Sequence, residues 1–229
     1  NENLINEGIN PEKIHFVGNI MIDSLIRHQK KSELSDIFDK LTMSQDESYA
    51  LVTLHRPSNV DEYDGLKMLL TSLVEIGKHI KIIFPMHPRT KKNIQDFGLS
   101  NYVNSSKNLI ITEPLGYFDF LKLEKNAKLI LTDSGGVQEE STYFRVPCLT
   151  LRENTERPIT ITEGTNQLVD LNVTSIVTKS LEIIEGKVKQ GKIPEYWDGK
   201  TAERVVTVLD KWFEKRDKAT DSTESTEKL

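Results

Sequence analysis

The chain has 229 residues, 37% of them hydrophobic, which is enough to bury the core of one large domain or two small ones. Its net charge of −5 offers nucleic acid no overall attraction, and its single cysteine excludes an internal disulfide. No apolar run approaches the roughly 20 residues of a membrane span, and no Cys/His cluster has zinc spacing. Because no signal peptide is recognisable, we expect a cytoplasmic protein.

The predicted elements alternate between short strands and helices along the chain. Before them, Glu2–Ile9 resembles the end of a helix stopped by Gly8. Strands that are apolar on both faces, each followed by a helix, predict a doubly wound parallel sheet. The strands are expected at 49–54, 80–85, 109–111, 129–131, 146–151 and 167–169, and the helices at 63–78, 90–97, 117–126, 137–143, 180–189 and 202–215.

The turn Ser134-Gly135-Gly136 lies between a predicted strand and a predicted helix. Backbone N–H groups at the start of a helix can bind a phosphate or diphosphate. Glu139 is placed to balance the helix dipole, whereas Glu140, one residue further, could accept hydrogen bonds from ribose hydroxyls. The competing interpretation is an ordinary tight turn, but its position between strand and helix favours a binding function.

Polar residues follow five of the predicted strands. In open parallel sheets, ligands bind beyond the carboxyl ends of the strands, so these residues are expected to converge on one crevice. They are His55-Arg56, His87, Glu113, Asp133-Ser134 and Arg152.

Several of these residues have alternative structural explanations. His55 could be a hydrogen-bonded structural histidine, and His87, before a proline, could shape a turn. Arg157 could be a surface charge, although an arginine near a diphosphate supplies charge-assisted hydrogen bonds. Cys148 lies in an apolar strand, and a buried core thiol is favoured over a reactive nucleophile.

Seven groups of residues, taken in order, resemble a known family. Over roughly residues 1–212 the chain is similar to the C-terminal domain of the non-hydrolysing UDP-N-acetylglucosamine 2-epimerases. The matching groups are Val17-Gly18-Asn19 with Asp23; Leu54-His55-Arg56 with Asn59-Val60-Asp61; Pro85 with His87-Pro88; Leu131-Thr132-Asp133-Ser134-Gly135-Gly136 with Gln138-Glu139-Glu140; Pro147; Leu151-Arg152 with Thr155-Glu156-Arg157-Pro158; and Glu163-Gly164-Thr165-Asn166.

The resemblance implies an α/β fold, a Rossmann-like parallel sheet with helices on both faces that forms the C-terminal half of a GT-B fold. Such a domain holds the UDP part of the substrate. By motif, Ser134, Gly135 and Gly136 would bind the diphosphate and Glu140 the ribose. Phe120 and the backbone near Leu115 would line the uracil pocket.

The resemblance also implies roles for cationic residues. His55, the catalytic candidate, and Arg157 would contact the phosphates or the leaving UDP. Arg56 and His87 match positions of an activator site that binds a second UDP-N-acetylglucosamine (UDP-GlcNAc) in bacterial members. Neither a metal ion nor a cofactor is implied.

The implied activity is interconversion of UDP-GlcNAc and UDP-N-acetylmannosamine (UDP-ManNAc) through elimination and re-addition of UDP. The family's proton-transferring carboxylates belong to an N-terminal domain missing here, so the chain alone is expected to be inactive. Alternatives are a GT-B glycosyltransferase domain and a non-catalytic nucleotide-sugar-binding protein. A homodimer is expected at full length, without a nucleic-acid or membrane partner.

The division expected along the chain has three parts. Residues 1–20 would be the remnant of an interdomain linker and helix. Residues 21–214 would form the Rossmann-like UDP-binding domain, and residues 215–229 a polar, disordered tail. Because residue 1 is asparagine rather than methionine, we expect the chain to be the C-terminal piece of something longer.

Overall fold

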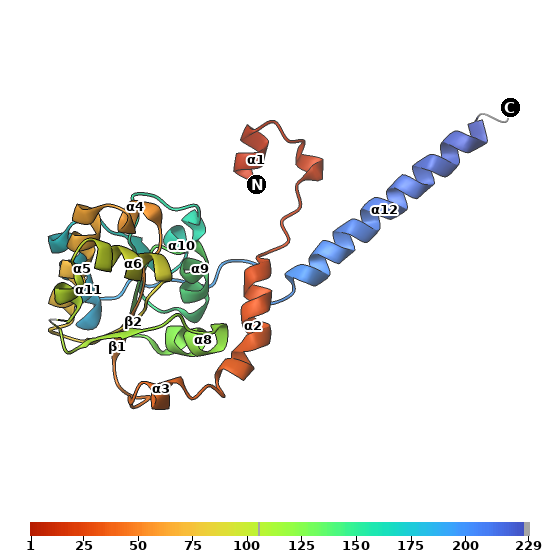
Figure 1. The fold of residues 1–229 in the computed structure, drawn as a ribbon. Coiled ribbons are helices and arrows are strands. Elements are labelled where there is room, and N and C mark those ends of the chain that lie inside the picture. The colour runs from red at the N-terminus through yellow and green to blue at the C-terminus, as the bar shows by residue number, and fades with distance from the viewer. Residues whose placement is uncertain (105, 227–229) are drawn as a thin grey trace. The chain divides into compact units, whose positions relative to one another are not determined.

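The computed structural model describes residues 1–104 and 106–226, which fall into two compact units (Figure 1). One unit comprises Asn1–Arg27 with Glu195–Leu229, and the other comprises His28–Pro194. Within the described residues, no helix is both long enough and apolar enough to cross a membrane.

The 28–194 unit is built on a parallel sheet, as predicted. Among the described residues the sheet has six strands in the order β3-β2-β1-β4-β5-β6, all neighbours being parallel. Because the chain winds outward from β1 to β3 and then returns to β4 on the other side of β1, the strand order reverses between β1 and β4. The strands are β1 (Tyr49–Thr53), β2 (Lys81–Pro85), β3 (Leu109–Thr112), β4 (Leu129–Thr132), β5 (Cys148–Thr150) and β6 (Asn166–Leu168).

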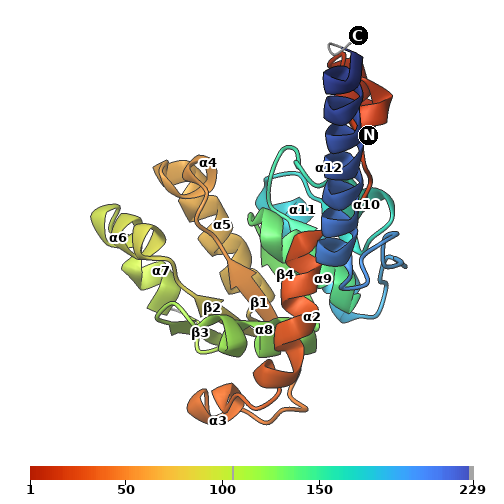
Figure 2. The same ribbon diagram turned by 90° about the vertical axis from the view of Figure 1, so that its right-hand side faces the viewer.

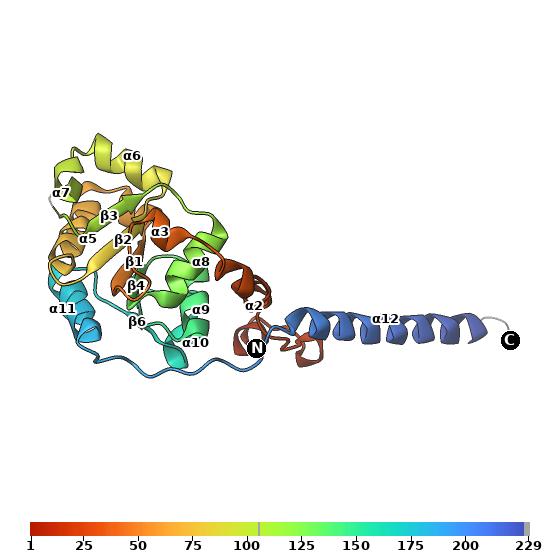
Figure 3. The ribbon, with the colours of Figure 1, turned by 90° about the horizontal axis from the view of Figure 1, so that it is seen from below.

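Each central strand sends side chains into two separate cores, because successive residues point to opposite faces. In β1, Ala50 and Val52 belong to one core, and Tyr49 and Leu51 belong to the other. Helices cover both faces, as predicted, with α5 and α11 on one side and α8 and α9 on the other (Figure 3). Helices contributing to the first core are α4 (Pro57–Val60), α5 (Tyr63–Ile76), α6 (Pro88–Asp96), α7 (Ser100–Asn104) and α11 (Val173–Ile184); those contributing to the second are α3 (Ile37–Lys40), α8 (Tyr117–Asn126) and α9 (Gly135–Phe144).

The main difference from the predicted elements concerns α11. The helix was expected at 180–189, but it begins at Val173 because the Asn172 side chain accepts a hydrogen bond from the Ser175 N–H at 2.8 Å. It ends before Gly186, which has a φ of +94° that a helix cannot continue through. The helices α2 (Ile20–Ser32), α3, α4, α7 and α10 (Pro158–Thr162) were not predicted.

The other unit contains α1 (Glu2–Asn6), a 3₁₀ turn at Pro11–Lys13, the first part of α2, and the long helix α12 (Thr201–Thr226), seen in Figure 2. Asp23 caps α12, since its carboxylate accepts from the Thr201 and Ala202 N–H groups at 3.2 and 2.9 Å. Gly18 has a φ of +106°, and a Cβ there would lie 2.5 Å from the Tyr196 carbonyl oxygen. The Gly18 and Asp23 motif positions therefore have structural roles within this unit.

The predicted helix 202–215 lies within α12. The tail 215–229 was predicted to be polar and disordered, but residues 215–226 form the end of α12, and residues 227–229 lie outside the described residues.

Candidate functional site

A pocket of about 260 Å³ opens at the carboxyl ends of the first strands. It brings together five residues that the sequence singled out, namely His55, His87, Leu115, Phe120 and Ser134. One part of the wall is polar and the other apolar, as a ligand with a charged part and a flat ring would require. The remaining lining residues are Thr53, Leu54, Pro85, Pro114 and Val137.

Asp133, directly after β4, organises the loop that follows β1. Its side chain is fully buried, and one carboxylate oxygen accepts hydrogen bonds from the N–H groups of His55 and Arg56 at 3.0 and 2.9 Å. The Asn59 amide also donates to Asp133 at 3.1 Å and to the Leu151 carbonyl at 2.8 Å, which joins the loop to the end of β5. Burial alone would raise the pKa of Asp133, but the hydrogen bonds from His55 and Arg56 outweigh it and hold that pKa below the usual value.

The His55 ring is oriented by the same carboxylate. Its Nδ1 lies 2.9 Å from Asp133 Oδ1, so the Nδ1 proton points at Asp133 and Nε2 is the ring nitrogen left for a ligand. The His87 ring lies beside it, with 5.8 Å between the ring centroids. His87 Nδ1 accepts from the Arg89 N–H at 3.2 Å and caps α6, so His87 has a structural role in addition to its place in the pocket wall.

The turn Ser134-Gly135-Gly136 forms the N-terminus of α9, as predicted. The first hydrogen bond inside the helix runs from the Gln138 N–H to the Ser134 carbonyl. The N–H groups of residues 135–137 therefore have no acceptor within the helix. Ser134 makes no side-chain capping bond within the described chain. Apart from its chain neighbours and the backbone of its own helix, a Cβ built on Gly136 would meet only Ser134 Oγ, at 4.0 Å. The glycine therefore leaves open space over the helix terminus, where an anion could lie against the N–H groups.

Arg157 lies beside this helix terminus. Its Nε is 3.2 Å from Glu139 Oε1, and a Cβ on Gly135 would lie 3.6 Å from the same nitrogen. Thr155 fixes the loop before Arg157, because its hydroxyl donates to Gln138 Oε1 at 2.6 Å and accepts from the Arg157 N–H at 2.9 Å. Glu139 thus pairs with Arg157 in addition to lying near the helix N-terminus.

Glu140 lies one helical turn after Gly136 and so shares its face of α9. It is 6% exposed, and its Oε1 accepts a hydrogen bond from the Tyr117 hydroxyl at 2.9 Å. Tyr117 begins α8, which packs against α9. The sequence did not single out Tyr117, since an aromatic residue at a helix start has no distinctive pattern.

Arg56 pairs with the loop after β5. Its guanidinium is 3.7 Å from Glu156, which forms two hydrogen bonds with Arg152 at 2.6 and 2.9 Å. The Arg152 contact lowers the pKa of Glu156 to about 2. The structure brings His87 into the pocket wall. The predicted site residues that are not among the lining residues are Arg56, Gly135, Gly136, Glu140 and Arg157.

Other matching residues have structural roles that the sequence did not reveal. A Cβ on Gly164 would lie 2.5 Å from the Thr160 carbonyl oxygen and from a Thr142 methyl group, so the close packing of α10 against α9 requires glycine here. Thr165 donates to the Val146 carbonyl at 2.8 Å. Cys148 is fully buried, and burial raises the pKa of its thiol to about 12, which fits the predicted core thiol.

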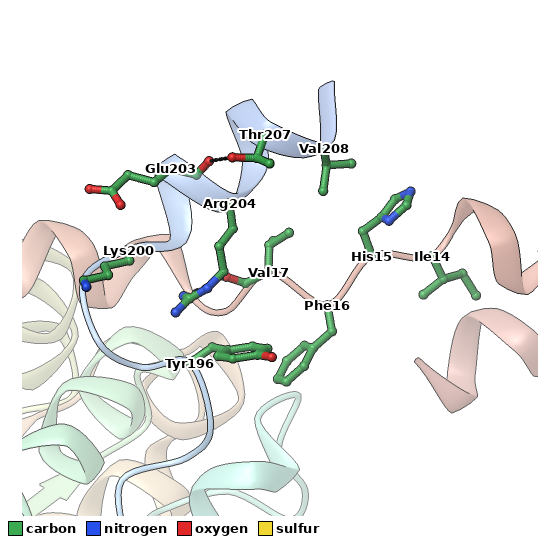
Figure 4. Close-up of a pocket in the computed structure, with 10 residues that line it drawn as sticks. All are labelled: Ile14, His15, Phe16, Val17, Tyr196, Lys200, Glu203, Arg204, Thr207 and Val208. Carbon is green, nitrogen blue, oxygen red and sulfur yellow. Dashed lines mark hydrogen bonds between the residues drawn. The ribbon is translucent and has the colours of Figure 1, made fainter. Parts of the chain in front are cut away.

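A second pocket, of about 500 Å³, lies in the unit of residues 1–27 and 195–229 (Figure 4). It is bounded by the Ile14–Val17 segment and by residues of α12. The Phe16 and Tyr196 rings face one another, with 5.1 Å between their centroids. The Arg204 guanidinium covers the Tyr196 ring and pairs with Asp198. No predicted site residue lines this pocket. Within residues 1–104 and 106–226, no group of His, Cys, Asp or Glu is arranged to hold a metal ion.

Comparison with known proteins points to one family. The family model described as UDP-N-acetylglucosamine 2-epimerase matches residues 1–210. A UDP-N-acetylglucosamine 2-epimerase of Methanocaldococcus jannaschii is 44% identical over 90% of this chain and 57% of its own length. One of Methanococcus maripaludis is 41% identical over the same shares.

The solved structures agree with the sequence comparison. The crystal structure of the M. jannaschii UDP-GlcNAc 2-epimerase in complex with UDP-GlcNAc and UDP is 44% identical, with a TM-score of 0.82 over 91% of this chain and 58% of that chain. The Rossmann-like fold predicted as half of a GT-B fold is thereby confirmed. The chain spans about three fifths of the length of the relatives it matches.

Proposed function

The chain belongs to the UDP-N-acetylglucosamine 2-epimerase family, and on that premise we propose that it is the UDP-binding part of an enzyme that interconverts UDP-GlcNAc and UDP-ManNAc. The enzyme is an isomerase. The observation that carries the proposal is the N-terminus of α9, where Gly136 leaves open space, Arg157 lies near Gly135, and Ser134 lines the same pocket as His55.

The diphosphate is proposed to lie against the N–H groups of residues 135–137, with Ser134 beside it. The apolar wall at Leu115 and Phe120 is proposed to receive the uracil ring, and Glu140, one turn along α9, is proposed to accept from the ribose hydroxyls. This arrangement assigns a group of residues to each part of UDP.

The reaction would use these groups to stabilise the leaving UDP. As the bond between C1 and the diphosphate breaks, negative charge grows on the leaving oxygen, and fixed N–H dipoles and Arg157 stabilise it. His55, held by Asp133 through Nδ1, offers Nε2 to the same region. Because UDP is held in place, the glucal intermediate can react with it again before the two diffuse apart.

Removal and return of the C2 proton are expected to use carboxylates, which this pocket does not supply. The pocket lining contains two histidines but, among the described residues, no carboxylate. We therefore propose that the acid–base groups come from an N-terminal domain outside these 229 residues. A homodimer and a cytoplasmic location belong to the same proposal.

Calorimetry with UDP tests the nucleotide site. We expect the protein to bind UDP, and to bind uridine much more weakly because the diphosphate supplies the charge-assisted contacts. An absence of heat at millimolar UDP would contradict the proposal. A glycosyltransferase would need an acceptor, so formation of UDP-ManNAc from UDP-GlcNAc alone, by the protein joined to its N-terminal domain, would distinguish the epimerase.

Replacement of Arg157 by alanine is expected to weaken UDP binding by about 1.5–3 kcal/mol, the contribution of a hydrogen bond to a charged group. The loss also leaves Glu139, which is 5% exposed, near the diphosphate. The dissociation constant from calorimetry gives the effect. Lys179→Ala, which removes an exposed cation paired with Glu182 on α11, is the matched control and should leave the affinity unchanged. An unchanged affinity in a folded Arg157→Ala protein would refute the role.

A further inference from the structure

Glu124 is a fully buried acidic residue in α8. Its side chain has no exposed surface, and neither carboxyl oxygen receives a hydrogen bond from a donor group among the described residues. It lies three residues after the buried Leu121, on the face of α8 that packs into the protein. A charged carboxylate in such a place would lose its water without compensation.

Glu124 interacts with Glu140, the residue proposed to hold the ribose, across the packed helices α8 and α9. Two buried carboxyls that interact across packed helices can share a hydrogen bond only if one of them carries a proton. Glu140 already accepts from the Tyr117 hydroxyl at 2.9 Å. Glu124 is the more buried of the two and lacks such a donor, so the proton belongs on Glu124.

We propose that Glu124 is a positioning residue for nucleotide binding: as a neutral carboxylic acid it donates a hydrogen bond to Glu140 and holds that carboxylate on the Gly136 face of α9. The inference rests on the proposed UDP site. Glu140 would then be fixed from two sides, by Glu124 and by Tyr117, and would present its remaining acceptor positions to the ribose hydroxyls.

The groups around this pair support the assignment. Burial and the neighbouring Glu140 raise the pKa of Glu124 well above its usual value. Tyr117 on α8 and Cys148 on β5 also have pKa values raised chiefly by burial, so both stay protonated near neutral pH. Glu139 on α9 is engaged with Arg157. Among these neighbours, the protonation states of Glu124 and Glu140 are the ones that determine how UDP binding depends on pH.

The sign of the pH effect follows from the contacts of Glu140. Burial and the neighbouring Glu139 raise the pKa of Glu140 above its usual value, and the hydrogen bonds from Tyr117 and Glu124 offset only part of that rise. As pH falls through the pKa of Glu140, the carboxylate gains a proton and UDP binding weakens. Removing the Glu124 donor should move this midpoint to higher pH. If Glu124 were instead ionised, its removal would relieve repulsion and move the midpoint to lower pH.

The test compares Glu124→Gln, which keeps a neutral donor, with Glu124→Met, which removes it. We expect Glu124→Gln to retain UDP affinity within about twofold, and Glu124→Met to lose about tenfold at neutral pH, the loss of one charge-assisted hydrogen bond. Calorimetric titrations across the acid range should show the midpoint raised in Glu124→Met alone. Because an apolar residue in place of a buried acid is often stabilising, a purely structural role predicts no loss of affinity.

Infrared difference spectra of the ligand-free protein make the test independent of UDP. Wild type minus Glu124→Gln should show the C=O stretch of a protonated carboxyl at neutral pH. Wild-type protein that binds UDP but lacks this band, or a lowered midpoint in Glu124→Met, would overturn the inference. Wild-type protein that shows the band but binds no UDP would overturn the proposed function, and with it the ribose-binding role of the pair.

Discussion

The variant Asp133→Asn is expected to lose about 3–5 kcal/mol of unfolding free energy at neutral pH, the cost of breaking a buried charged network by removing one partner. An asparagine has the same shape, but its amide nitrogen is a donor. If the amide nitrogen took the place of Oδ1, it would face the His55 Nδ1 proton. If it took the place of Oδ2, it would face the Asn59 amide and the backbone N–H groups of the loop. At least one buried donor is then left without an acceptor.

The pH dependence of this loss has a definite sign. The pKa of Asp133 is lowered in the folded protein, so its contribution to stability is present above the usual aspartate pKa and disappears as pH falls through the lowered value. We therefore expect the stability difference between wild type and Asp133→Asn to shrink in acid. Urea denaturation at several pH values measures it.

Asp170→Asn is the matched control for Asp133→Asn, because Asp170 also follows a strand of the sheet but is exposed. It should change stability by less than about 0.5 kcal/mol. If Asp133→Asn were as stable as this control, Asp133 would not organise the loop. UDP binding by the folded fraction of Asp133→Asn should also weaken, since His55 loses the carboxylate that orients its ring.

The sheet and the helix terminus could be predicted because their signals are local. A run such as Leu129–Leu131 is apolar on both faces, and this pattern alone predicts a strand within a parallel sheet. The Ser134-Gly135-Gly136 turn follows it directly. Once the sheet is assumed parallel, the strand ends must converge, and His55, His87 and Ser134 meet in one pocket.

The supporting contacts could not be predicted, because they join residues far apart in the sequence. Asp133 binds the backbone of His55 and Arg56, 78 and 77 residues earlier, and nothing near Asp133 marks that pairing. Glu124, between Leu123 and Lys125, resembles a surface charge until α8 is packed against α9. Its spacing from Leu121 was the available signal, because residues three apart share one face of a helix. A charged residue on the apolar face of a helix is unusual enough to mark a special role.

The variant Gly136→Ala is expected to weaken UDP binding by about 3 kcal/mol or more, roughly a hundredfold, while leaving the protein folded. The proposed diphosphate lies against the N–H groups of residues 135–137, and a methyl group on Gly136 would occupy that space. Two or more charge-assisted hydrogen bonds would lengthen or break. Calorimetric titration with UDP measures the loss.

The same substitution should slightly stabilise the protein without UDP. A loss of UDP affinity together with a gain in stability could not be caused by unfolding. The new Cβ meets only Ser134 Oγ at 4.0 Å, and alanine is favoured over glycine in a helix by about 0.5–1 kcal/mol. Gly65→Ala, in the first turn of α5, is the matched control, because its Cβ would make ordinary contacts at 3.8 and 3.9 Å. Both variants should gain stability, but only Gly136→Ala should lose affinity for UDP. If Gly136→Ala bound UDP as tightly as wild type, the glycine would serve the turn alone and the diphosphate would have to lie elsewhere.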